Sequence, residues 1–243
     1  MSVTLQRWCT WSGPLFIGVF FGGILIAGWL PPVSANLSTD AVASMYGENA
    51  DSIRMGALLI GASSFAQGVW AAVMSCQLRR IEGDRPLFTY MQLAGGAVGI
   101  FVVIFPAFLF AVAAFTPSRD PQITKAFHDL GWLALVGVGW PAILQALAVA
   151  AATLTDRSER PVFPRWFGWF NIWTALAFLP GPFLIFFHTG AFAWHGAAVF
   201  WLPATAFGVW FAVWFVVLRR AIAQEARDGT VAEGTTPDSL VTA

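Results

Sequence analysis

The stretch LFTYMQLAGGAVGIFVVIFPAFLFAVAAF, residues 87–115, contains no charged side chain. About 20 apolar residues cross the ~30 Å hydrocarbon layer of a bilayer as a helix, because only a helix satisfies its own backbone polar groups there. The stretch therefore predicts a transmembrane helix. Since it is longer than the layer requires, we expect it to tilt or kink.

Five further apolar stretches predict spans at residues 11–30, 55–78, 130–154, 166–187 and 194–218. The composition agrees, because 58% of the residues are hydrophobic and 11% are charged, whereas soluble domains carry about 25% charged residues. We predict an all-α, polytopic bundle of six transmembrane helices over residues 1–220. Residues 221–243 are small, polar and weakly patterned, and we expect a disordered cytoplasmic tail.

Basic residues divide unevenly between alternate connections. Ten of the 13 Lys and Arg residues lie before the first span, in residues 79–85 and 157–165, and after the last span. Because short cytoplasmic loops retain Lys and Arg, both termini are predicted in the cytoplasm, with the chain in a bacterial inner membrane. Alternatively, Val33-Ser34-Ala35 ends a signal peptide cleaved before Asn36, which would leave five helices.

One outer connection, residues 31–54, contains a second structural signal. Ser38-Thr39-Asp40 precedes a short run of helix-forming residues, and a hydroxyl in this position caps a helix N-terminus. We predict a short surface helix here, either a lid or a spacer.

The interiors of the predicted spans contain polar groups but no ionisable side chains. The amides are Gln67, Gln92, Gln145 and Asn171. Amides in membrane helices commonly form hydrogen bonds between helices, so we interpret them as interhelical contacts, with the polar floor of a pocket as the alternative.

Prolines and aromatic residues gather in the last four spans and predict a cavity. A proline removes one backbone donor and can kink a helix, so kinks at similar depth would splay the helices outward and leave space near Val102, Gly137, Phe178 and Val199. We expect an outward-facing pocket of roughly 300–1,000 Å³. Its candidate residues are Pro106, Pro141, Phe178, Pro180, Pro182, Phe183, Phe200, Trp201 and Pro203.

Two pairs of glycines indicate close helix contacts. Gly18 and Gly22 on the first span, and Gly95 and Gly99 on the third, have the four-residue spacing that lets helix backbones approach. The spacing fits contacts within the bundle and equally contacts with a membrane-protein partner or a second copy.

All three histidines, His128, His188 and His195, are predicted at the outer ends of the last spans, with Asp129 beside the first. These side chains are suitable zinc or copper ligands, but their spacing matches no known ligand pattern. We treat them as weak metal candidates and predict neither a metal nor a cofactor. The formal net charge is zero, which disfavours nucleic-acid binding.

Three segments carry a resemblance: residues 78–86, LRRIEGDRP; residues 129–133, DLGWL; and residues 161–173, PVFPRWFGWFNIW. With these segments the chain resembles an uncharacterised family of bacterial six-helix membrane proteins that has no established activity. The resemblance implies the topology and no site residues.

The expected function is binding of a small apolar molecule in the bilayer, without catalysis, because no nucleophile elbow, phosphate loop or dinucleotide fingerprint occurs. The alternatives are an accessory subunit of a membrane complex, a small-molecule transporter and a membrane-embedded metalloenzyme.

Overall fold

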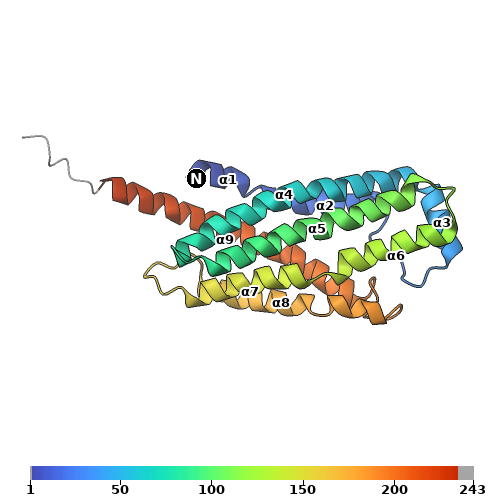
Figure 1. Cartoon of the computed structure of the whole chain (residues 1–243). Helices are drawn as coiled ribbons and strands as arrows, with labels where there is room; N and C mark the ends of the chain where they lie inside the picture. Colours follow the sequence, from blue (N-terminus) through green and yellow to red (C-terminus); the bar gives the residue numbers. More distant parts are fainter. Residues whose placement is uncertain (1, 235–243) are drawn as a thin grey trace, which may run out of the picture.

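Six helices long and apolar enough to cross a membrane form the computed structural model, which describes residues 2–234 and side chains through residue 228 (Figure 1). The described part contains no strand. The elements are α1 Val3–Cys9, α2 Ser12–Ile26, α3 Thr39–Glu48, α4 Ala50–Glu82, α5 Leu87–Phe115, α6 Pro121–Gly137, α7 Trp140–Thr155, α8 Arg165–Phe178, η1 Gly181–Phe186, η2 Ala197–Trp201 and α9 Leu202–Gly234.

The six predicted spans are confirmed, although most of them have different ends. The span at residues 87–115 is α5. The second span is the 33-residue α4, whose length of about 50 Å exceeds the hydrocarbon layer. The fourth span is α6 and α7 together, which are separated by a break at residues 138–139.

Helix α4 packs between α2 and α5, while α5 also contacts α6 and α7, and α7 contacts α8. Helix α9 packs against α1, α2, α4 and α8. Figure 1 shows that α3 lies across one end of the bundle, which we call the α3 end, and that α9 extends beyond the other.

At the other end of the bundle, which we call the basic end, α1 and α9 both contact α4. The buried Gln77 side chain of α4 donates at 2.6 Å to the side chains of both Gln6 of α1 and Glu225 of α9. Arg80 donates to Gln77 at 2.7 Å and to the backbone oxygen of Ala221 at 3.0 Å. These bonds fix the last helix to α1 and α4.

The disordered tail predicted for residues 221–243 is corrected, because α9 continues through Gly234. Ala221 and Ile222 are buried against the bundle, and the Glu225 bonds extend the contact by another turn. Tertiary packing therefore supports a segment whose own sequence pattern is weak. Residues 235–243 lie outside the described part.

Charged side chains cap both ends of α5. At the basic end, the Glu82 carboxylate accepts from the backbone N–H groups of Phe88 and Thr89, each at 2.7 Å. At the α3 end, the Arg54 guanidinium donates to the backbone oxygen of Ala114 at 2.9 and 3.1 Å. A negative group at the N-terminus and a positive group at the C-terminus both stabilise a helix dipole.

The glycine pair on the third span lies within the bundle. A Cβ atom on Gly95 would lie 2.7 Å from the Gln145 side chain of α7. One on Gly99 would lie 2.7 Å from the Gln67 amide nitrogen of α4. The pair therefore lets α5 approach two neighbouring helices.

The glycine pair on the first span faces open space, since nothing described lies within 4 Å of a Cβ atom on Gly18 or Gly22. The close approach of α2 to α4 instead uses Gly23 and Gly56. A Cβ atom on either would lie 2.7 Å or less from the backbone oxygen of the other. Within the bundle, α2 therefore uses a neighbouring glycine, and a contact of Gly18 and Gly22 with a partner or a second copy stays a prediction.

The short helix predicted in the first outer connection is α3, and the Ser38 hydroxyl caps it by accepting from the backbone N–H of Ala41 at 3.2 Å. Tyr46 of α3 forms a buried hydrogen bond with His128 of α6 at 3.1 Å. This bond fixes α3 across the end of the bundle.

Candidate functional site

Three of the predicted proline kinks coincide with irregular backbone. Two residues separate the end of α6 from Trp140 and Pro141, which open α7. Helix α8 ends at Phe178, before the 3-10 turn that contains Pro182. The π-helical turn η2 precedes Pro203. By contrast, α5 continues through Pro106 without interruption.

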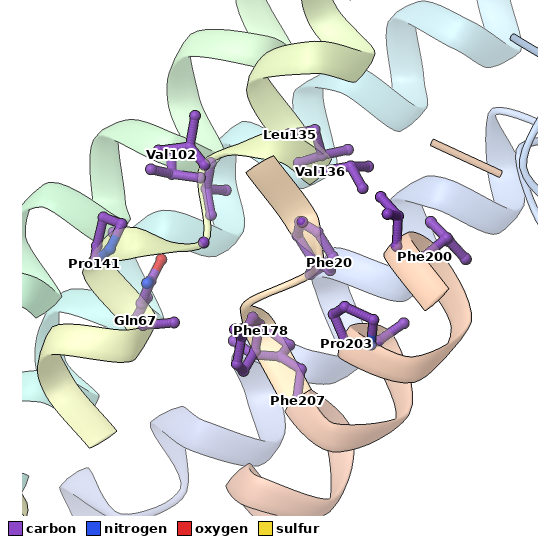
Figure 2. A pocket seen from close by; sticks show the side chains of 18 of the residues that line it. Phe20, Gln67, Val102, Leu135, Val136, Pro141, Phe178, Phe200, Pro203 and Phe207 are labelled. Carbon is purple, nitrogen blue, oxygen red and sulfur yellow. The ribbon is translucent and has the colours of Figure 1, made fainter. Parts of the chain in front are cut away.

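A cavity of about 140 Å³ lies where these irregular segments meet. Its walls come from α2, α5, the α6–α7 break, the end of α8, and η2 with the start of α9, and Gln67 of α4 also contributes (Figure 2). Residues shown around it include Phe20, Gln67, Val102, Leu135, Val136, Pro141, Phe178, Phe200, Pro203 and Phe207.

Four of the predicted pocket residues line this cavity: Pro141, Phe178, Phe200 and Pro203. Val102 and Val199 from the expected position also line it, while Val136 and Val138 line it on either side of Gly137.

The other five predicted residues, Pro106, Pro180, Pro182, Phe183 and Trp201, do not line the cavity. Phe183 and Trp201 are turned outward, with 53% and 44% of their surface exposed. Neighbouring positions on one turn point in different directions, so a residue adjacent to a lining residue need not share its face.

Sequence reasoning missed the wall formed by α2, where Phe16, Phe20 and Ile24 line the cavity. This helix has no proline after its first turn, and proline was the signal used. Phe16, Phe20 and Ile24 are spaced by four residues, which places their side chains on one face of the helix. This spacing could have predicted the α2 wall.

The cavity is smaller than the predicted drug-sized pocket. Its volume of about 140 Å³ is close to that of a ~150 Å³ apolar cavity able to hold benzene. No Asp, Glu, Lys, Arg or His residue lines it. The site therefore suits a small neutral molecule.

Three of the four interior amides form contacts between helices. Gln92 of α5 accepts from the Ser75 hydroxyl of α4, and Gln145 of α7 donates to the backbone oxygen of Gln92 at 3.3 Å. Asn171 of α8 accepts from the Trp210 indole of α9 at 2.8 Å. For these three residues the interpretation as interhelical contacts fits the geometry.

Gln67 differs from the other three, because its side-chain oxygen is buried without a hydrogen-bond partner among the described residues. The residue is only 8% exposed and lines the cavity. Gln145 lines the cavity as well, so the position of both amides agrees with the alternative interpretation of a polar floor.

Two of the histidines, His128 and His195, have separate partners, and so does Asp129. His195 accepts from the backbone N–H of Ala35 at 3.0 Å, His128 bonds with Tyr46, and Asp129 accepts from Lys125 at 2.8 Å. Within residues 2–228, no three His, Cys, Asp or Glu side chains are placed to hold one metal ion. The weak metal candidates are therefore not brought together. His195 instead joins two loops, and His128 joins α6 to α3.

An aromatic cluster separates the cavity from α3. It consists of Trp29, Phe110, His128, Trp132 and Trp194, in which the Trp132 and Trp194 rings stack with centroids 6.3 Å apart. Trp132 also contacts Phe200 of the cavity wall, with ring centroids 6.4 Å apart. Side chains, rather than an open channel, therefore lie between Phe200 and His128.

Comparison with known proteins gives no relative, because no protein family, curated protein or solved structure matches the chain. The resemblance to a bacterial membrane-protein family stays a prediction. What the fold defines is a multi-pass, all-helical protein with six helices able to span a membrane.

Proposed function

We propose that this chain is a bacterial inner-membrane protein that binds a small apolar molecule in the cavity between its helices. Its orientation is part of the proposal: the basic end faces the cytoplasm, as the ten basic residues in its connections favour. Entry from the bilayer is supported by Val138, a cavity-lining residue at the α6–α7 break that is 41% exposed.

The observation that carries the proposal is an uncharged cavity surrounded by helix interruptions. Protein interiors are normally packed as densely as organic crystals, and an apolar void costs about 24 cal/mol per Å³. A bound molecule would offset that cost. Because the walls are apolar except for amides, a neutral molecule of about six to nine heavy atoms fits the available volume.

Photolabelling tests the proposal. The protein in lipid nanodiscs is irradiated with phenyldiazirine, a benzene ring that carries a photoreactive group, and adducts are mapped by peptide mass spectrometry. We expect adducts at cavity residues such as Phe20 and Phe207. Ala204→Leu, which places a larger side chain in the cavity wall, should reduce them at least fivefold.

The matched control is Ala62→Leu, at an exposed position of α4, which should leave cavity labelling unchanged. Circular dichroism establishes that both variants are folded. Labelling confined to lipid-facing residues, or equal cavity labelling in both variants, would refute the proposal. That result would favour the alternative of an accessory subunit without an enclosed site.

A further inference from the structure

We propose that the ligand of the cavity carries a hydroxyl group, as a small phenol or alcohol does, and that this hydroxyl binds the side-chain amide of Gln67. This inference rests on the proposed function and specifies the chemical class of the ligand.

The first argument is the missing partner of Gln67. Its oxygen is buried without a hydrogen bond in the described structure, and a buried polar group left in that state is strongly unfavourable. The nearby hydroxyls do not satisfy it, because Ser63 and Ser64 donate at 2.6 Å to the backbone oxygens of Ile60 and Gly61 in their own helix. No donor in the described part of the chain meets this oxygen, and a bound molecule can supply one.

The second argument is the space made for the amide. A Cβ atom on Gly99 of α5 would lie only 2.7 Å from the Gln67 amide nitrogen. The glycine thus lets the amide lie close to α5, and Figure 2 shows Gln67 among the lining residues, which include Val102 and Pro141. Gln67 and Gly99 both line the cavity, so a ligand there meets the amide directly.

The third argument is chemical class. An amide offers both an acceptor and donors, and a hydroxyl is the smallest neutral group able both to donate and to accept. A cationic amine or a carboxylate would find no opposite charge, since no charged residue lines the cavity. An ether or a ketone cannot donate to the amide oxygen. A benzene ring with one hydroxyl or hydroxymethyl group matches both the volume and the polar contact.

Competition against phenyldiazirine labelling tests the inference with three molecules of similar size. Benzyl alcohol donates and accepts, its isomer anisole only accepts, and toluene does neither. At equal concentration within the nanodisc, we expect benzyl alcohol to compete about three- to tenfold better than toluene, which is the effect of one hydrogen bond. Anisole should fall well short of benzyl alcohol.

Gln67→Met keeps the length of the side chain and removes the amide. In this variant the preference for benzyl alcohol over toluene should disappear, because the amide that binds the hydroxyl is gone. A preference that persists in Gln67→Met would overturn the inference. If that variant does not fold, the comparison of benzyl alcohol with anisole in the native protein decides.

Failure of this inference is distinguishable from failure of the proposed function. Equal competition by all three molecules in the native protein would exclude a role for the hydroxyl and leave an apolar binding site. Absence of competition by any of them would refute both proposals.

Discussion

Replacement of Gly56 by alanine tests the contact between α2 and α4. The new Cβ atom would lie 2.5 Å from the backbone oxygen of Gly23 and 2.7 Å from the Ala27 Cβ atom. Ordinary contact begins near ~3.5 Å, so the two helices must separate by about 1 Å. Overpacking of this kind costs roughly 1–3 kcal/mol, whereas alanine regains about 0.5–1 kcal/mol of helix propensity. The free energy of unfolding should fall by about 1–2 kcal/mol.

The measurement is reversible unfolding in mixed micelles with increasing SDS, followed by circular dichroism. Gly22→Ala is the matched control, because nothing described lies within 4 Å of its Cβ position. It should be neutral or slightly stabilising. If Gly56→Ala is as harmless as Gly22→Ala, the close approach of the two backbones is wrong. If the control is the more damaging variant, the contact face of α2 is the one that the Gly18–Gly22 spacing predicts.

Three further predictions concern the ends of the bundle. Arg54→Leu removes the cap of α5 and should lower the free energy of unfolding by about 1–3 kcal/mol in the same SDS titration, whereas Asp51→Asn, which affects an exposed ion pair, should change it little. Burial raises the pKa of Tyr46. The unfolded chain therefore loses the tyrosine proton at a lower pH than the folded protein, and thermal stability should fall as the pH rises above the ordinary tyrosine pKa of about 10. In the control variant Tyr46→Phe, this part of the pH dependence should be absent. In a cysteine-free background, an impermeant maleimide added outside the cell should label Ser44→Cys and not Ser158→Cys, and the reverse pattern would overturn the orientation.

The transmembrane helices could be predicted from the sequence, because a run of about 20 apolar residues satisfies its own backbone polar groups inside a bilayer by forming a helix. The α5 stretch shows this most clearly, since both of its ends were predicted correctly. The helix interruptions were harder to predict. Pro106 and Pro141 carry the same chemical signal, yet only Pro141 lies beside a break. The difference lies in the neighbours, because Gly137 ends α6 and Gly139 lies in the break, and both lower the cost of leaving helical geometry.

The face that each residue presents was harder still. Phe200 lines the cavity while its neighbour Trp201 is exposed. Both belong to the π-helical turn η2, where hydrogen bonds span five residues and the 3.6-residue period no longer gives direction. A similar ambiguity separated Gly22 from Gly23 on α2. A rotation of α2 about its axis by one residue position would decide which of the two glycines contacts α4. That rotation is set by the packing of the neighbouring helices, which the sequence pattern of α2 does not contain.

The folded protein contains this cavity at a cost in stability that larger side chains in its wall would reduce. At about 24 cal/mol per Å³, a void of about 140 Å³ costs roughly 3 kcal/mol, which is a sizeable part of the stability of a small protein. Ala142 and Ala204 both line it, and a larger side chain at either position would recover part of that cost. Gln67 adds a second cost, because a Leu or Met there would need no partner. A void and an unsatisfied amide are independent penalties, and both fall on the same small volume. A single bound molecule with an apolar body and one hydroxyl would remove both.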